Sequence, residues 1–349
     1  MQILKPRVPL KEKMFFVEHL YVMLKASISL DRALLTIGTQ TRNKAFAKII
    51  ASIEQTVRSG ATLSEGLLRY ESVFGAFFIN MVKAGEFSGK LEEALHRLHI
   101  QLKKDYDLKS KVKGALSYPT FVVVAMIVIG AAMMAYVMPK IIPLFQSFGA
   151  QLPLATRILI AVSNFVSAYI IWIVIFGIVA VVGLMRLLRG PARGPWHAAL
   201  LHIPVIKRFV QEVNLARFAR TFSTLLSTDI LVTEALQMTS RVVENEQYRR
   251  ALSAASNKIK TGVPIASVFK EYSSLFPPTV HTMIAVGEES GTLTTLLDEV
   301  AEFYEESVDE MSKSLSSILE PILIVILGAA VGGIAIAILM PMYSLVEQI

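Results

Sequence analysis

The sequence of 349 residues predicts an all-α membrane protein with two homologous cytoplasmic six-helix bundles and three transmembrane helices. Three observations support this prediction: three long stretches carry no charge, the chain repeats itself at a constant offset, and apolar residues in each repeat recur at helical spacing. Hydrophobic residues make up 53% of the chain and charged residues 18%, against about 25% charged in a typical soluble domain. A wholly soluble protein and a disordered one are therefore both excluded.

The uncharged stretches define the transmembrane helices. None of residues 114–139, 158–185 and 321–346 is charged, and each stretch contains enough apolar residues for a helix of about 20 residues to cross a bilayer. We place the transmembrane helices at 114–139, 168–188 and 314–341, with apolar cores at 119–139, 168–188 and 321–341. Residues 158–167 are more polar, because they include Ser163 and Asn164, and we expect them to form an interfacial segment within a short periplasmic loop, 140–167.

The basic residues orient the chain in the membrane. Lysine and arginine concentrate before the first transmembrane helix and after the second, at Arg97, Lys103, Lys104, Lys109, Lys111, Lys113, Arg186, Arg189, Arg193, Lys207 and Arg208. Because basic loops stay in the cytoplasm, we expect cytoplasmic domains at 1–113 and 189–313 and a periplasmic tail at 342–349. The charges Lys11, Glu12 and Lys13 argue against a signal peptide. The net charge of +7 is thus explained by membrane flanks, and we expect no nucleic-acid partner.

An internal repeat establishes the architecture. A shift of 202 positions places Phe16 on Phe218 and Pro119 on Pro321 without a gap, and it aligns 85–91 with 287–293. The protein is therefore a duplicated unit, copy 1 and copy 2, in which a helical domain leads directly into a membrane helix. The extra transmembrane helix at 168–188 allows both copies to share one orientation.

Each copy is expected to be helical. Phe46, Ile49, Ile50 and Ile53 follow the helical period, and strand-like alternation is absent. Gly60 and Gly262 suit left-handed turns at helix ends, and residues 62–65 have the spacing of a capping box. The last helix of each copy is expected to continue into its membrane helix.

The repeated turn is the strongest candidate site. It superficially resembles a phosphate-binding loop. Its glycine spacing, the leucine after the lysine and its helical context, however, do not match the pattern that such a loop requires. We expect Gly85 to end one helix and Ser88 to cap the next. Contact with a partner, through Glu86 and Glu288, is an equally good interpretation. The candidate residues are Gly85, Glu86, Ser88, Gly89, Gly287, Glu288, Ser290 and Gly291.

Neither enzyme chemistry nor a cofactor is expected. The chain has no cysteine, which excludes thiolate catalysis and zinc–cysteine or iron–sulfur sites. His96 and His99 lie three residues apart, but copy 2 does not repeat them and no third ligand is evident. A structural calcium at Glu92 and Glu93, or in the acidic run at 298–310, stays open as an alternative. The equivalent helix of copy 1 is basic, so the two copies could dock on each other or on different partners.

The uncharged stretches at 114–139, 158–185 and 321–346 contain no Asp, Glu, Lys, Arg or His residue, which argues against ion or proton transport. Gly328 and Gly332 form a small-residue face for close helix packing, and Gly130 is the equivalent of Gly332. Internal packing and self-association are both compatible with these glycines.

Several motifs together resemble the type II secretion F family, the inner-membrane platform proteins of type II secretion systems and type IV pili. They are Lys111-x-x-x-Ala115-x-x-Tyr118-Pro119, Ala84-Gly85-Glu86-x-Ser88-Gly89-x-Leu91, Ile203-Pro204-Val205-Ile206, Arg217-Phe218-Ala219-Arg220-Thr221, Val286-Gly287-Glu288-x-Ser290-Gly291-x-Leu293 and Glu320-Pro321. Many members carry an extension before the first helical domain. In this sequence the apolar pattern of that domain already begins near Phe15. Where the family often has glycine after the first long helix, this chain has Ser27 and Asp229.

The resemblance implies a non-enzymatic protein of the bacterial inner membrane that couples a hexameric assembly ATPase to pilin or pseudopilin polymerisation. It also implies contacts with inner-membrane alignment proteins, the lipid bilayer and other copies of the chain. No flexible linker separates the domains from the membrane, so we expect coupling through Lys111, Tyr118, Pro119, Lys313, Glu320 and Pro321. The alternative is a subunit of an oligomeric channel or transporter.

Overall fold

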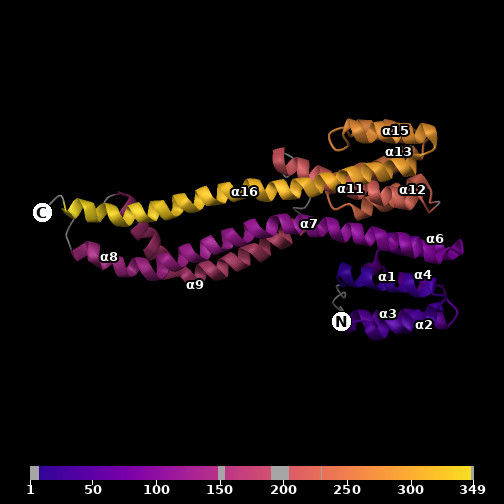
Figure 1. Cartoon of the computed structure of the whole chain (residues 1–349), viewed down its shortest axis with the longest axis horizontal. Helices are drawn as coiled ribbons and strands as arrows, with labels where there is room; N and C mark the ends of the chain where they lie inside the picture. Colours follow the sequence, from indigo (N-terminus) through magenta and orange to yellow (C-terminus); the bar gives the residue numbers. More distant parts are fainter. Residues whose placement is uncertain (1–7, 148–153, 190–203, 229, 347–349) are drawn as a thin grey trace. The chain divides into compact units, whose positions relative to one another are not determined.

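The computed structural model describes residues 8–147, 154–189, 204–228 and 230–346 (Figure 1). The described residues form helices and no strands, which confirms the predicted all-α architecture. The chain divides into two compact units. The first comprises Met1–Ser110 and His197–Asp309 and thus holds both repeated bundles; the second comprises Lys111–Trp196 and Glu310–Ile349 and holds the apolar helices.

Copy 1 folds around the apolar faces that its periodicity predicts. In α3 (Lys44–Arg58), Phe46, Ile49, Ile50 and Ile53 are buried. The Asn43 side chain begins this helix by accepting hydrogen bonds from the first backbone N–H groups. The other helices of copy 1 are α1 (Leu10–Lys25), α2 (Leu30–Gln40), α4 (Leu63–Leu68), α5 (Glu71–Phe74), α6 (Ala76–Phe87) and the first part of α7 (Leu91–Ala132).

Copy 2 repeats this order of helices. Its described helices are α11 (Pro204–Leu226), α12 (Val232–Val242), α13 (Glu246–Ile259), α14 (Ile265–Glu271), α15 (Pro278–Ser290) and the first part of α16 (Leu293–Val346). Each copy has an aromatic core at equivalent positions: Phe16 packs on Phe74 with ring centroids 5.8 Å apart, and Phe218 packs on Phe276 at 5.2 Å. Such pairs contribute about 0.5–1.5 kcal/mol beyond their buried area.

Turns follow the predicted chemistry. Gly60 and Gly262 adopt φ angles of 93° and 85°, the left-handed region that glycine enters without strain. The capping box is confirmed, because Thr62 accepts from the Glu65 backbone N–H and the Glu65 side chain accepts from that of Thr62. Ser27 also has a positive φ, 59°; its equivalent, Asp229, lies outside the described residues.

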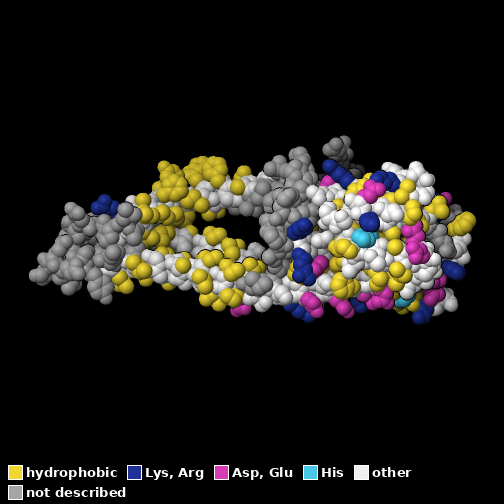
Figure 2. Space-filling model, turned by 90° about the horizontal axis from the view of Figure 1, so that it is seen from above, with side chains coloured by type: hydrophobic (Ala, Val, Ile, Leu, Met, Phe, Trp, Pro, Cys, Tyr) yellow, Lys and Arg dark blue, Asp and Glu magenta, His cyan; other side chains and the backbone are white. Residues whose placement is uncertain are grey.

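The last helix of each copy continues into an apolar helix, as predicted. Helix α7 begins in the first unit at Leu91 and passes Pro119 without ending, and α16 does the same from Leu293 past Pro321. Among the described residues, three helices are long and apolar enough to cross a membrane. Figure 2 shows apolar side chains along them and charged side chains gathered over the first unit.

The second transmembrane helix differs from the prediction. Helix α9 (Leu154–Arg189) includes the segment that we expected to be interfacial, and its apolar stretch within the described residues is Thr156–Gly177. The buried Ser163 hydroxyl of this segment donates to the Met134 carbonyl at 2.7 Å, so this polar side chain has a hydrogen-bond partner. Met134 lies in a short π-helix, η1 (Met133–Val137), which precedes α8 (Met138–Ser147). A π-turn disrupts the regular ladder of backbone hydrogen bonds, and the serine satisfies this carbonyl.

Candidate functional site

The glycines of the repeated turn have two different roles. Gly85 lies within α6, which continues to Phe87, so the prediction that Gly85 ends the helix is wrong. A Cβ added at Gly85 would lie 2.4 Å from the Ala94 Cβ, and one at Gly287 would lie 2.8 Å from the Leu293 Cα. These glycines therefore allow the helices before and after the turn to pack closely.

Gly89 and Gly291 make the reversal itself. Their φ angles are 69° and 70°, and Gly291 is the left-handed residue that ends α15. The Ser88 hydroxyl donates to the Ala84 carbonyl at 2.9 Å, and the Ser290 hydroxyl donates to the Val286 carbonyl at 2.6 Å. Each serine thus satisfies a carbonyl at the end of the preceding helix. The prediction that Ser88 caps the following helix is wrong, because its hydroxyl is turned the other way.

Glu86 and Glu288 reach back to the start of another helix. The Glu86 carboxylate accepts from the Leu63 and Ser64 backbone N–H groups at 2.5 and 2.9 Å. The Glu288 carboxylate accepts from those of Ile265 and Ala266 at 2.9 and 3.2 Å. The N-termini of α4 and α14 thus each receive a carboxylate that complements the helix dipole. This contact explains the repeated glutamate by folding; partner contact stays a prediction.

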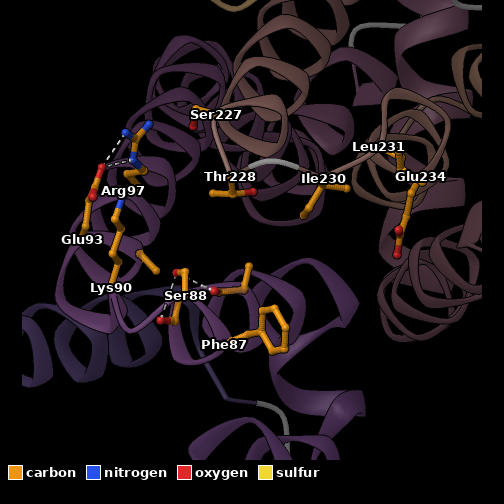
Figure 3. A pocket seen from close by; sticks show the side chains of 13 residues that line it. Phe87, Ser88, Lys90, Glu93, Arg97, Ser227, Thr228, Ile230, Leu231 and Glu234 are labelled. Carbon is orange, nitrogen blue, oxygen red and sulfur yellow. Dashed lines mark hydrogen bonds and ion pairs between the residues drawn. The ribbon is translucent and has the colours of Figure 1, made fainter.

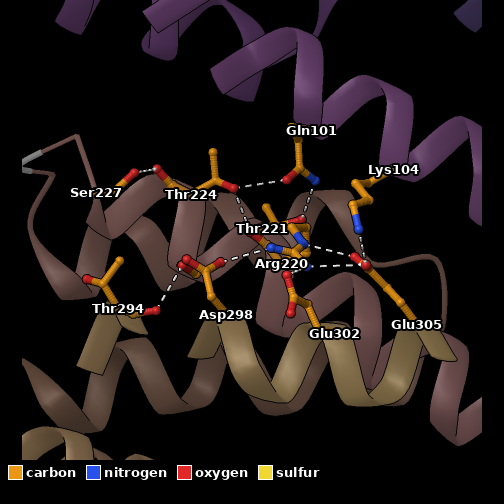
Figure 4. Close-up of polar contacts among 11 residues, drawn as sticks. Gln101, Lys104, Arg220, Thr221, Thr224, Ser227, Thr294, Asp298, Glu302 and Glu305 are labelled. Atoms are coloured by element: carbon orange, nitrogen blue, oxygen red, sulfur yellow. Dashed lines mark hydrogen bonds and ion pairs between the residues drawn. The ribbon is translucent and has the colours of Figure 1, made fainter. Parts of the chain in front are cut away.

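The two copies meet through polar side chains of α7, α11 and α16 (Figure 4). The Gln101 amide nitrogen donates to the Thr221 hydroxyl at 3.3 Å, and its oxygen accepts from the Thr224 hydroxyl at 3.0 Å. Gln101 and Thr221 are both buried. Lys104 of copy 1 pairs with Glu305 of copy 2 at 2.8 Å. The predicted docking of the basic helix on the acidic one is therefore present in the structure.

Arg220 organises the acidic run at this contact. Its guanidinium pairs with Glu305 at 2.8 Å and with Asp298 at 3.0 Å. Burial lowers the pKa of Arg220, but the hydrogen bonds to Glu305 and the charges of the acids outweigh it and raise the pKa above its ordinary value. Burial raises the pKa of Glu305, but the bonds from Arg220 and Lys104 outweigh it and leave the pKa lowered. The cluster is thus held in its charged form.

A second group of ion pairs lies near the end of the same contact. Arg217, which is almost fully buried, lies 3.3 Å from Asp105 of copy 1 and 3.3 Å from Glu244 of its own copy. Lys109 also pairs with Asp105, at 2.8 Å. Gln101, Arg217 and Arg220 were not predicted from the sequence as contact residues. A signal existed: Arg220 and Glu305 have opposite charges, and so do their equivalents, Glu18 and Lys103.

A groove borders the repeated turn of copy 1 (Figure 3). A cavity of about 580 Å³ lies between the α6–α7 turn and the α11–α12 junction, with Ser88, Lys90 and Arg97 on one side and Thr228 and Glu234 on the other. Phe87 also lines it and is 96% exposed. Gly85 and Ser88 are the candidate residues that reach this cavity.

The acidic and histidine clusters form no evident metal site. Among the residues that the structure describes, no group of three or more histidine or acidic side chains could hold a metal ion. Asp298 and Glu305 of the acidic run are engaged by Arg220. His96 lies against the Tyr21 ring, with centroids 4.7 Å apart. Structural calcium stays an untested alternative.

The residues predicted at the membrane entry and in the transmembrane helices lie in the second unit. Tyr118 is half-exposed on α7, and Lys313, Glu320 and Pro321 are exposed on α16, while Lys111 and Pro119 are partly buried. A Cβ built at Gly130, Gly328 or Gly332 meets no described atom within 4 Å. The described part of the chain therefore leaves these small-residue faces free.

Comparison with known proteins reproduces the repeat found in the sequence. The family described as "Type II secretion system (T2SS), protein F" matches residues 16–139 and again residues 218–341, which are 202 positions apart. The chain belongs to this family. This membership confirms the resemblance inferred from the motifs.

Family relatives come from pili and from secretion systems. A type IV pilus assembly protein PilC of Thermus thermophilus is 33% identical over 97% of this chain and 83% of its own length. The type IV pilus assembly protein TapC of Aeromonas hydrophila is 34% identical over 93% of this chain and 78% of its own. The type II secretion system protein F of the same organism is 28% identical over 96% and 86%.

Proposed function

We propose that this family member is a non-enzymatic inner-membrane platform protein of a type IV pilus or type II secretion machine. In this role the two bundles bind a cytoplasmic assembly ATPase and pass its motion to pilin or pseudopilin subunits in the membrane. The names of its relatives support the assembly role. The observation that carries the coupling is the pair of unbroken helices, α7 and α16, that lead from the bundles into apolar segments at equivalent positions.

The proposed orientation follows from charge. Basic residues flank the bundle side of the first and second transmembrane helices, and such residues remain in the cytoplasm. Both bundles then face the ATPase, and 140–167 with the C-terminal tail faces the periplasm. Inner-membrane alignment proteins and further copies of the chain are proposed partners within this assembly.

An insertion in α7 tests rigid coupling. About seven residues of Gly/Ser placed after Lys113 would interrupt the helix by two turns, whereas an Ala-rich insert of equal length would extend it. We expect the Gly/Ser variant to insert in the membrane and to abolish pilus assembly or secretion, while the Ala-rich variant retains part of the activity. Normal assembly with the Gly/Ser insert would refute coupling through α7.

ATPase binding needs a separate test. Full-length protein, purified in detergent with a tag, should retain the assembly ATPase from native membranes, and the bound protein is identified by mass spectrometry. The alternative, a channel subunit, predicts solute flux when the protein is reconstituted in liposomes. Flux without ATPase binding would favour the channel.

A further inference from the structure

The contact between the two copies uses different surfaces of a repeated domain. Copy 1 contributes α6 and α7, and copy 2 contributes chiefly α11 and α12. We call the first surface face A; its equivalent in copy 2 is formed by α15 and α16. We call the second face B and include in it Glu305 of α16, which pairs with Lys104; its equivalent in copy 1 is formed by α1 and α2 together with Lys103 of α7. One chain thus contains two faces of each kind, and the described contacts join face A of copy 1 to face B of copy 2.

Face A is covered in copy 1 and open in copy 2. Met81 is 0% exposed, whereas its equivalent Met283 is 37% exposed. Gln101 is 6% exposed, whereas its equivalent Phe303 is 59% exposed. Met283 and Phe303 line an apolar cavity of about 600 Å³ between α15 and α16. Copy 2 therefore presents an uncovered apolar version of the surface that is buried in copy 1.

Face B shows the opposite pattern. In copy 2, Thr224 is partly buried and bonded to Gln101. Its equivalent in copy 1, Val22, is 55% exposed. The two open faces lie on opposite copies, so the described part of a single chain leaves one face of each kind uncovered.

The open faces match each other in chemistry at the position of the Gln101–Thr224 contact. The hydrogen bond between Gln101 and Thr224 becomes an apolar pair, Phe303 with Val22, when each residue is replaced by its equivalent. Both partners change from polar to apolar together. A buried apolar pair needs no hydrogen-bond partner, so the exchanged contact is as compatible with burial as the original.

Charges are exchanged in the same way. The ion pair between Lys104 and Glu305 becomes Glu306 with Lys103, a pair of reversed sign that still attracts. Glu306 and Lys103 are both exposed.

The groove beside the turn repeats this reversal. Arg97 and Glu234 line it from opposite sides, and their equivalents are Glu299 and Arg32. Both of these equivalents are exposed as well. One reversed ion pair and one reversed arrangement of opposite charges along the groove indicate complementary surfaces.

We propose that face A of copy 2 binds face B of copy 1 in a second copy of this chain, so that chains associate head to tail with the geometry seen inside one chain. Such a heterologous contact repeats from chain to chain and ends in a ring when its rotation closes. This inference goes beyond the platform function and does not depend on it.

Cross-linking in the cysteine-free chain tests this contact. Full-length Phe303→Cys and Val22→Cys variants with different tags are co-expressed, and membranes are treated with a short bismaleimide. We expect a product at twice the chain mass of 38.5 kDa that carries both tags, and little product from either variant alone. A chain that carries both Phe303→Cys and Val22→Cys should give a ladder of cross-linked products. The mass of the largest product gives the number of subunits in the assembly.

Two controls define the outcomes. Gln101→Cys with Thr224→Cys in one chain should cross-link internally, which shows that this spacing suits the reagent. With that control positive, an absence of mixed product would overturn the proposal, and so would efficient product from Phe303→Cys alone, because that result indicates a two-fold contact.

Charge exchange provides a second measurement. Glu306→Lys should weaken association about fivefold, as expected for loss of an exposed ion pair worth up to about 1 kcal/mol. Lys103→Glu added to the Glu306→Lys chain should restore it. Failure of the second change to rescue the first would argue against this pairing. Neither the cross-linking nor the charge-exchange measurement requires pilus assembly. The proposal of a head-to-tail contact can therefore be refuted independently of the proposed platform function.

Discussion

Removal of the Glu86 carboxylate should loosen α4 without disturbing the rest of copy 1. In Glu86→Ala, the Leu63 and Ser64 backbone N–H groups lose acceptors at 2.5 and 2.9 Å. Hydrogen bonds to charged groups contribute about 1.5–3 kcal/mol each, but water can replace part of this at a half-buried site. Loss of a helix cap costs about 0.5–2 kcal/mol, and the lost interaction with the helix dipole adds about 0.3–1 kcal/mol. We expect a local loss of about 2 kcal/mol.

Hydrogen exchange of the full-length protein in detergent measures this loss directly. A local loss of about 2 kcal/mol should speed exchange of the Leu63–Leu68 amides about 30-fold. Glu288→Ala should act in the same way on Ile265–Glu271, because its carboxylate caps α14. Glu92→Ala removes an equal charge from an exposed position and serves as the matched control.

A different result would assign Glu86 to a partner. If exchange in α4 is unchanged in Glu86→Ala while pilus assembly or secretion is lost, the carboxylate acts outside its own bundle. If exchange and assembly change together, the fold explains both, and the partner contact has no separate support.

Three further outcomes are expected. Gly85→Ala should lower the free energy of unfolding of the solubilised protein by about 1–3 kcal/mol, because the new Cβ would lie 2.4 Å from the Ala94 Cβ. Gly130→Ala is the control: its new Cβ meets no described atom within 4 Å, so the thermal unfolding temperature should change little. Glu305 has a pKa lowered from 4.5 because its bonds to Arg220 outweigh burial, so its contribution to stability is present above about pH 4.5 and lost as the pH falls through the folded-state pKa; acid unfolding curves of Glu305→Gln should lack this loss. Ser163→Ala should destabilise the α9–η1 contact by about 0.6–1.5 kcal/mol, because the 2.7 Å hydrogen bond from the Ser163 hydroxyl to the Met134 carbonyl is lost. Unfolding in SDS measures this change.

The repeat and its local signals were predictable from the sequence. Gly60 and Gly262 have the expected left-handed conformation, and the helices α7 and α16 continue past the membrane-entry prolines as expected. These features depend on hydrophobic periodicity and on the steric freedom of single residues. Such effects act between near neighbours in the chain, and a linear pattern records them.

The second transmembrane helix contains a contact that linear hydropathy does not record. Ser163 lowers the apolarity of its segment, yet its hydroxyl is paired with a carbonyl 29 positions away. A hydropathy scale assigns one value to serine, whereas the cost of burying it depends on whether an acceptor is present. The pairing of Ser163 with the Met134 carbonyl therefore became evident only from the fold.

Sequence alone determined the duplicated helical unit, its three apolar helices and the family to which it belongs. Tertiary structure decided what the charged and small residues of the repeat contact. The Glu86 carboxylate accepts hydrogen bonds from backbone N–H groups 22 and 23 positions away, and Lys104 pairs with Glu305 at a separation of 201 positions. Electrostatic and packing partners are chosen by proximity in space, and a single sequence carries no direct record of contacts between distant residues.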